Sequence, residues 1–175
     1  FPKAPTLPKA RFEHPPVVVG AGPAGLFAAL TLARAGVQPI LIERGKPVEE
    51  RTKSVQMMQE QGILDPESNV QFGEGGAGAF SDGKLTTGTK SPLIRTVLQT
   101  FVDHGAPEDI LYIAKPHVGT DLLKGVVRSM RQEIIQLGGQ VRFDTRLTGL
   151  MWRGESMEGI TVLCGGETQE IRTDT

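Results

Sequence analysis

The chain has 175 residues, with 19 Lys and Arg against 20 Asp and Glu, and 38% of its residues are hydrophobic. Such a composition is typical of a globular chain that buries a core without disulfides or metals. Cys164 is the only cysteine, which excludes an internal disulfide, a Cys-x-x-Cys redox pair and a cysteine zinc cluster. The sequence lacks a membrane-length apolar run, a signal-peptide core and a basic stripe suited to nucleic acid. We therefore expect no membrane or nucleic-acid partner, no metal site, and a cytoplasmic location, or the plastid stroma if the source is a plant.

The N-terminal residues 1–14 contain Pro2, Pro5 and Pro8 and have no apolar period. This composition predicts an extended linker, which ends at Pro15 and Pro16. We expect residues 1–14 to be a linker from a missing upstream region, and residues 15–175 to be the N-terminal part of a longer domain.

Residues 17–43 read as a β-α-β unit. The run Val17–Val19 is too apolar for a strand with a wet face and predicts a buried parallel strand. A glycine-rich turn at 20–25 leads into a helix that ends at Gly36, and residues 39–43 form the returning strand. The helix places four residues on one inward face, namely Leu26, Ala29, Leu30 and Ala33.

The middle of the chain alternates helices with one long loop. Residues 47–62 predict a helix with Val48, Val55, Met58 and Ile63 inward. Residues 65–90 are rich in glycine but include Phe72 and Phe80, which favours an ordered, functional loop. Helices are then expected over 91–105 and 120–138. The second would bury Leu123, Val126, Val127, Met130, Ile134 and Leu137.

From Gln140 the apolar period becomes two. Val141, Phe143, Thr145 and Leu147 alternate with charged residues, which predicts one strand over 141–147. Further strands are expected at 159–162 and from Glu170. The predicted fold class is α/β, a Rossmann-like βαβ domain with a β-meander that is incomplete at the C-terminus.

The turn Gly20-x-Gly22-x-x-Gly25 has the spacing of a dinucleotide-binding motif. Gly20 allows a tight turn, Gly22 lets the backbone approach a pyrophosphate, and Gly25 permits close helix–strand packing. Glu43, at the end of the next strand, would bind a ribose diol and disfavour the 2′-phosphate of NADP. A purely structural strand–turn–helix is the alternative. The predicted contacts from this turn are Gly20, Ala21, Gly22, Pro23, Ala24 and Gly25.

This motif serves FAD and NAD alike, so the choice between them stays open at this point. Arg44 and Gly45 place a guanidinium and a flexible residue beside the expected ribose. Arg51 follows at helical spacing, and we expect it to return to the pyrophosphate.

Residues 73–85 form a second glycine-rich segment. Its small residues would let backbone approach a planar or phosphorylated ligand, with Ser81 and Lys84 as polar contacts. A mobile surface loop is the alternative. His117 is the candidate general acid or base because histidine titrates near neutral pH, although a structural role before a helix cap is equally compatible.

The sequence resembles the bacterial and plastid family of FAD-dependent, or NAD(FAD)-utilising, dehydrogenases within the glutathione-reductase-like flavoprotein superfamily. The matching stretches are residues 18–30, 43–45, 69–85, 114–121 and 138–143. The resemblance implies an FAD held by its ADP half on the βαβ unit, with Leu147 at the position that clasps the adenine. It places the segment 75–85 near the flavin, with Gly75, Gly76, Ala77, Ser81, Lys84 and Leu85 as contacts.

The function expected from this resemblance is that of an FAD-binding oxidoreductase, a dehydrogenase that transfers two electrons or a hydride through the flavin to a small-molecule substrate. NAD(P)H is the candidate electron donor, and the remaining parts of the same polypeptide are the expected partner. The segment 73–85 has no cysteine pair, which excludes disulfide reductase chemistry. The alternatives are an NAD-binding dehydrogenase domain and a flavin-binding scaffold in RNA modification.

Overall fold

The computed structural model describes residues 12–85 and 87–175. Within them the strands form two three-stranded sheets. The parallel sheet has the order β1 (Val17–Val19), β2 (Ile40–Ile42) and β3 (Gln140–Arg142), so β2 lies in the middle. The antiparallel meander consists of β4 (Thr145–Arg153), β5 (Ser156–Cys164) and β6 (Glu167–Arg172). These two sheets confirm the predicted α/β class with a β-meander.

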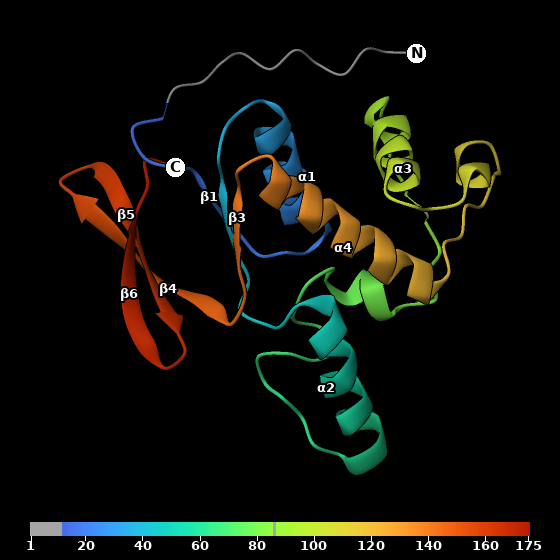
Figure 1. Cartoon of the computed structure of the whole chain (residues 1–175), viewed down its shortest axis with the longest axis horizontal. Coiled ribbons are helices and arrows are strands. Elements are labelled where there is room, and N and C mark those ends of the chain that lie inside the picture. Colours follow the sequence, from blue (N-terminus) through green and yellow to red (C-terminus); the bar gives the residue numbers. More distant parts are fainter. Residues whose placement is uncertain (1–11, 86) are drawn as a thin grey trace.

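The helices lie mainly on one side of the molecule, and the meander lies on the other (Figure 1). Helix α2 extends away from the remaining helices, at the bottom of that view. The α-helices are α1 (Pro23–Arg34), α2 (Val48–Gln61), α3 (Leu93–Asp103) and α4 (Thr120–Gln136), and the short 3₁₀ helices are η1 (Ala77–Phe80) and η2 (Glu108–Leu111). None of the helices in the described ranges is both long and apolar enough to cross a membrane.

The main core forms where α1 and α4 pack against the parallel sheet. The four residues predicted to face inward from α1 are all buried, at 0–2% exposure. Leu41 of β2 and Met130 of α4 belong to the same cluster. A second cluster joins the two sheets and consists of Ile40, Ile42, Ile160, Val162 and Ile171. Burial on both faces of β2 explains why its sequence is continuously apolar.

The prediction of one continuous strand over 141–147 is wrong, because these residues belong to two strands in different sheets. Val141 pairs with Leu41 in the parallel sheet, whereas Thr145 pairs with Cys164 in the meander. Between them Asp144 has a φ of +49°, a left-handed conformation that Asp tolerates better than most side chains. The chain therefore leaves one sheet and enters the other at this residue.

Some residues expected to face inward are exposed. Ile63 is 51% exposed and Leu137 is 42% exposed, because each lies just beyond the last turn of its helix. Met58 is half-buried, whereas Val48 and Val55 are buried as expected. Only the N-terminal part of α2 reaches the body of the molecule, which accounts for this difference.

The expected linker lies largely outside the described residues, since residues 1–11 are not among them. Its last residues contact the other end of the chain. The amides of Glu13 and His14 donate to the Asp174 carboxylate at 2.9 and 3.0 Å. The Val17 amide donates to the carbonyl of Thr175 at 2.9 Å, so β1 is held beside the C-terminal residues.

Candidate functional site

The glycine turn between β1 and α1 leaves donors and open space at the helix N-terminus. Gly20 has a φ of +96°, and a Cβ on Gly25 would lie 1.8 Å from the Gly20 carbonyl oxygen, so both positions require glycine. Gly22 is the N-cap residue of α1 and has no side chain to cap the helix. A Cβ on Gly20 or Gly22 would meet nothing within 4 Å. This end of α1 therefore presents free amides and a partial positive charge to a ligand.

Glu43 follows β2 and is only 6% exposed. Its Oε2 accepts a hydrogen bond from the Ala21 amide at 2.8 Å, and its Oε1 accepts from the amides of Gly45 and Gly73 at 2.9 and 3.1 Å. A carboxylate has about four lone-pair positions, so three amides leave one for a ligand hydroxyl. The structure thus adds a scaffolding role to the ribose contact predicted for Glu43.

A cavity of about 380 Å³, here called the turn cavity, opens above these residues. It brings together several predicted contacts that are far apart in sequence, from both sheets and the glycine-rich loop. Its volume lies within the ordinary range of about 300–1,000 Å³ for ligand pockets. The predicted residues in its lining are Gly20, Gly22, Glu43, Arg44, Gly76 and Leu147.

Two arginines in the turn cavity are fixed by one carboxylate. Arg44 Nε and Arg146 Nη1 lie 2.7 and 2.8 Å from the two oxygens of Glu67. The hydrogen bond from Arg44 lowers the pKa of Glu67. Arg44 also lies over the ring of Phe72, with 4.2 Å from Cζ to the ring centroid. Arg146, Glu67 and Phe72 were not predicted as site residues; the signals in the sequence were the adjacency of Arg146 to Leu147 and the place of Phe72 in the glycine-rich loop.

A second cavity of about 190 Å³, here called the loop cavity, lies between α1, α4 and the glycine-rich loop. Its lining includes the predicted contacts Pro23, Gly75, Ser81, Lys84 and Leu85. The two cavities adjoin, because Gly22 and Gly76 line the first and their chain neighbours Pro23 and Gly75 line the second. Where they adjoin, a Cβ on Gly76 would lie 3.2 Å from Pro23 Cδ, so glycine lets the loop approach the start of α1 closely.

Two adjoining cavities suit a long nucleotide ligand better than a short nucleotide. Comparison with known protein families identifies which nucleotide this is. A family model described as an FAD binding domain matches residues 13–174. The chain belongs to this FAD binding domain family. FAD is the cofactor that the membership supports, and the uncapped end of α1 and the two adjoining cavities beside it fit such a ligand.

A relative of high similarity is an uncharacterised protein of Clostridium beijerinckii. It is 56% identical over 147 residues, which are 84% of this chain and 28% of that protein. The chain therefore spans less than a third of the length of the curated relative that it matches.

Solved structures share the fold at low identity. Thermovibrio ammonificans THI4 has a TM-score of 0.59 and 14% identity, covering 92% of this chain and 54% of that chain. The 3-ketosteroid-Δ4-(5α)-dehydrogenase of Rhodococcus jostii has a TM-score of 0.53 and 16% identity, covering 94% and 45%. A geranylgeranyl bacteriochlorophyll reductase-like protein of Thermoplasma acidophilum has a TM-score of 0.50 and 14% identity, covering 91% and 37%.

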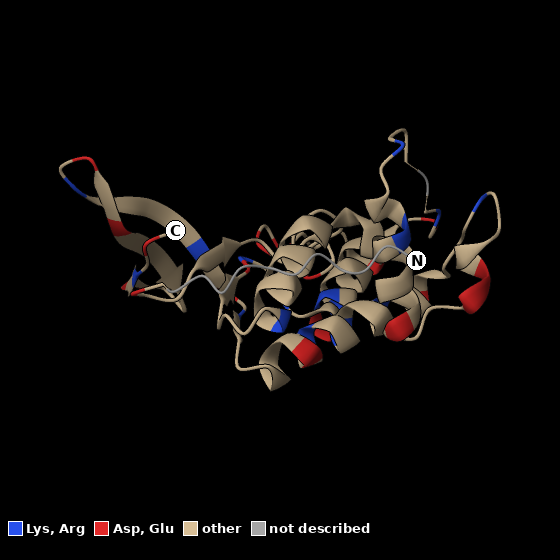
Figure 2. Ribbon diagram, turned by 90° about the horizontal axis from the view of Figure 1, so that it is seen from above, with Lys and Arg blue, Asp and Glu red and all other residues tan. Residues whose placement is uncertain are grey.

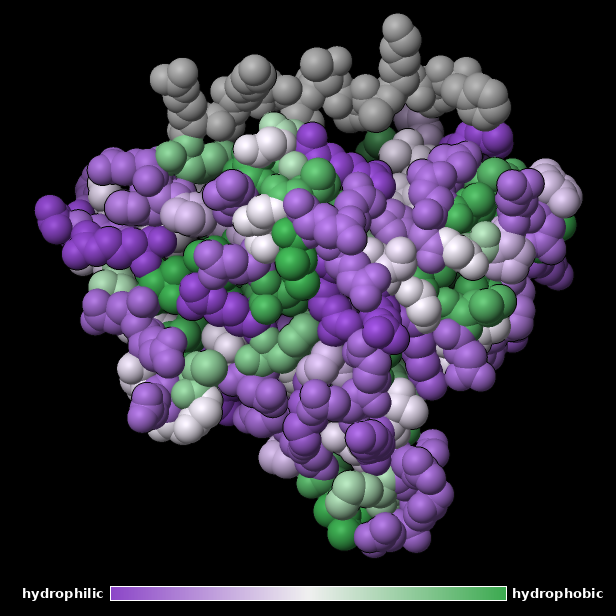
Figure 3. Space-filling view, viewed as in Figure 1, coloured by the Kyte–Doolittle hydropathy of each residue, from purple (hydrophilic) through white to green (hydrophobic). Residues whose placement is uncertain are grey.

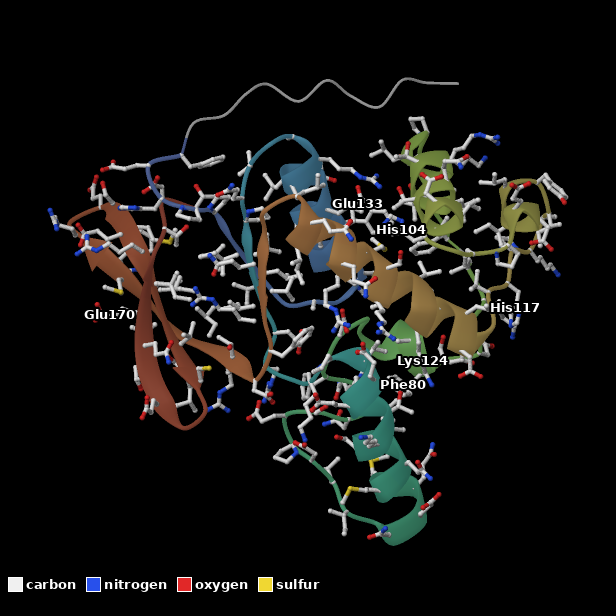
Figure 4. All side chains as sticks on the ribbon, viewed as in Figure 1. Phe80, His104, His117, Lys124, Glu133 and Glu170 are labelled. Carbon is white, nitrogen blue, oxygen red and sulfur yellow. The ribbon has the colours of Figure 1, made fainter. Side chains whose placement is uncertain are left out.

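Arg51 occupies a different position in this FAD-binding domain from the one expected. Its side chain is fully buried beneath the loop, and its burial lowers its pKa to about 10. It lies over the ring of Phe80, which Lys124 also approaches (Figure 4). Its guanidinium donates to the carbonyls of Asn69, Val70, Gly73, Glu74 and Gly76 at 2.6–3.4 Å. Arg51 therefore orders the loop from behind and lies outside the lining of both cavities.

The remaining predicted residues divide between scaffold and surface. Ala21 and Gly45 are buried, and a Cβ on Gly45 would lie 2.6 Å from the Glu67 carbonyl oxygen. Ala24 and Ala77 are exposed and lie outside the lining of either cavity.

His117, the acid–base candidate, also lies outside both linings. Its Nε2 lies 2.7 Å from the carbonyl oxygen of Asp82, and its backbone forms a β-bridge with Lys84. Because a carbonyl only accepts, Nε2 carries the proton in this contact and Nδ1 is the nitrogen left to exchange one. His117 is exposed, and a Cβ on Gly83 would lie 3.3 Å from its Nε2. Its contacts are those of a residue that holds the loop in place.

Proposed function

We propose that the chain is the FAD-binding part of a flavin-dependent dehydrogenase that acts on a small organic substrate. The observation that carries the proposal is the pair of adjoining cavities that meet where Gly22 and Pro23 face Gly76 and Gly75. Bound FAD supplies two-electron or hydride transfer, and the protein supplies binding and orientation. The resemblance to the FAD-dependent dehydrogenases of the glutathione-reductase-like superfamily supports this finer assignment.

In this proposal the turn cavity takes the ADP half of FAD. The amides at the start of α1 face the pyrophosphate, and the free lone pair of Glu43 accepts from a ribose hydroxyl. Arg44 and Arg146 flank the same cavity as fixed positive charges, since Glu67 holds both of them. Leu147 lies in the lining, where its backbone would clasp the adenine.

The loop cavity takes the flavin end in the same proposal. Gly75 brings backbone close to the ligand, while Ser81 and Lys84 provide polar groups and Leu85 an apolar contact. Arg51 keeps this loop in shape through its hydrogen bonds to the carbonyls of the segment 69–76. NAD(P)H as electron donor, a cytoplasmic location and the rest of the polypeptide as partner belong to the proposal as well.

Two alternatives make different predictions. A domain that binds NAD alone would use the turn cavity and leave the loop cavity without a role. A scaffold for RNA modification would need gathered positive charge, whereas basic and acidic residues are interspersed along the described ribbon (Figure 2). Both alternatives are therefore less well supported than a bound flavin.

The visible absorption spectrum of the purified protein tests the proposal. We expect flavin bands, and the nucleotide released on denaturation to be FAD by mass spectrometry. Anaerobic addition of NADH and NADPH in parallel then identifies the donor, because the flavin bands bleach on reduction. A protein that ignores added FAD but binds NAD, or that binds RNA in a salt-dependent way, would contradict the assignment.

A further inference from the structure

A third cavity, of about 770 Å³, lies beyond the loop cavity and has not been used so far. It is walled by α3, by η2 and by the chain on either side of these elements; we call it the α3 cavity. Most of its lining is apolar or aromatic, including Leu85, Leu93, Ile94, Phe101, Tyr112 and Ile113.

The polar lining of this cavity is confined to one segment of the chain. Lys84, Thr87, Thr89 and Ser91 are its polar members, and they are close together in sequence. A mostly apolar cavity with a few polar groups is the usual composition of a small-molecule site, and its volume lies in the usual range. The Lys84 amine lies 2.7 Å from Asp82, and its side chain is 69% exposed, so it is accessible to a ligand.

The α3 cavity and the loop cavity adjoin each other. Lys84, Leu85 and Phe101 line both of them. A molecule in the α3 cavity would therefore lie beside the space where the proposed function places the flavin end of FAD. These shared residues distinguish the α3 cavity from an unrelated surface hollow.

The mouth of the cavity presents apolar side chains to solvent. Leu93, Tyr112 and Ile113 are 59%, 78% and 38% exposed, and all three belong to the lining. Figure 3 shows apolar surface on the same side of the molecule, at the right of the view, where α3 and η2 lie. Exposed apolar side chains that cluster in this way often mark a binding surface.

We propose that the α3 cavity binds the organic substrate, an apolar ring or chain that carries one anionic or hydrogen-bond-accepting group at the Lys84 end. The assignment rests on the proposed function for its position beside the flavin. The residues proposed to hold the apolar part all belong to this chain's described residues, so they can be tested apart from the flavin. The Lys84 amine selects the polar group, and α3 and η2 enclose the apolar part.

Fluorescent probes of the stated chemistry test the cavity in the full-length, FAD-loaded protein. Anilinonaphthalene sulfonate is apolar with one anionic group, and N-phenylnaphthylamine is its uncharged counterpart. Ile94→Trp fills the cavity from α3, since Ile94 is half-buried and lines it. Ile135→Trp on α4 is the matched control, because Ile135 is 50% exposed and lies outside the lining.

We expect Ile94→Trp to weaken the binding of both probes by about tenfold or more, and Ile135→Trp to leave it unchanged. Lys84→Met should weaken the anionic probe alone, because only that probe uses the amine. Equal probe binding by the Ile94 and Ile135 variants would overturn the proposal that this cavity binds the apolar molecule. A full-length protein that binds neither probe because its own chain fills the cavity would overturn it as well. Equal loss of both probes in Lys84→Met would overturn the polar end.

The flavin absorbance of each sample separates this proposal from the proposed function. Probe binding that depends on Ile94 in a protein without flavin would support the cavity and contradict the assignment of FAD. Full flavin content together with probe binding that ignores Ile94 would support the assignment of FAD and overturn the cavity.

Discussion

Glu43 Oε2, just after β2, accepts a hydrogen bond of 2.8 Å from the backbone amide of Ala21 in the glycine turn. The other oxygen of the same carboxylate accepts from Gly45 and from Gly73, which lies in the glycine-rich loop. One buried side chain thus joins three segments that surround the turn cavity. The walls of the proposed cofactor site are therefore held together by the protein's own contacts.

We predict that Glu43→Gln lowers both FAD affinity and stability. A glutamine retains one accepting oxygen, and its amino group would face backbone donors, leaving buried amides unpaired at a cost of about 1–3 kcal/mol. Flavin fluorescence quenching and chemical denaturation measure the two effects. Glu170→Gln is the control, because Glu170 is exposed on β6 (Figure 4) and lies outside the lining of the turn cavity and the loop cavity. Equal affinity of the two variants would contradict the scaffolding role.

Gly25→Ala should destabilise the fold although alanine favours helices in general. Its Cβ would lie 1.8 Å from the Gly20 carbonyl oxygen, so the glycine turn or α1 must shift. Overpacking of this kind costs about 1–3 kcal/mol, and the displaced turn should lose FAD as well.

Gly125→Ala is the matched control within a helix. Gly125 is exposed on α4, and a Cβ there would meet nothing within 4 Å. Gly125→Ala should therefore raise the free energy of unfolding by about 0.5–1 kcal/mol. Thermal unfolding of both variants checks the opposite signs.

Local patterns were sufficient to predict α1 and its turn. The inward residues Leu26 and Leu30 follow the helical period, and Gly20 and Gly25 are required by contacts within a few residues of themselves. The strand–turn–helix unit that carries the glycine motif could be predicted for the same reason, and the cofactor contacts assigned to it remain a prediction.

Features that depend on distant segments could not be predicted. The alternation of Val141 and Leu147 continues through Asp144, so periodicity alone could not show that the chain changes sheet there. Helical spacing placed Arg51 near the phosphates, but its partners are carbonyls 18–25 residues further along the chain. The Glu67 clamp on Arg44 and Arg146 likewise exists only after folding.

Arg51→Lys should destabilise the loop despite conserving the charge. The planar guanidinium satisfies carbonyls in several directions, whereas a lysine amine has three donors on one atom. We expect a loss of about 2–4 kcal/mol and weaker FAD binding, because buried carbonyls and a buried charge lose partners. Arg153→Lys is the control, since that side chain is 76% exposed. A variant as stable and as flavin-rich as this control would contradict the role of Arg51.

Glu74 provides a pH-dependent contact behind the same loop. Its side chain is fully buried, and its Oε2 accepts from the Val48 amide at 2.8 Å and from Arg131 at 3.1 Å. Its Oε1 has no hydrogen-bond partner among the described residues. Burial raises the pKa of Glu74 from 4.5 to about 7, with Val48 and Arg131 opposing the shift. The folded protein therefore retains a proton that the unfolded chain releases.

Glu74→Gln should remove this pH dependence. Between pH 4.5 and 7 the folded state binds more protons than the unfolded state, so the contribution of Glu74 to stability falls as the pH rises and is constant above 7. The shift corresponds to about 3 kcal/mol, and glutamine keeps an oxygen for the Val48 amide without titrating. Denaturation at several pH values measures the unfolding free energy of the unchanged protein and of the variant. As the pH rises across this range, the unfolding free energy of the unchanged protein should fall relative to that of the variant. A difference that stays constant with pH would show that Glu74 is ionised throughout, and that Arg131 outweighs the cost of its burial.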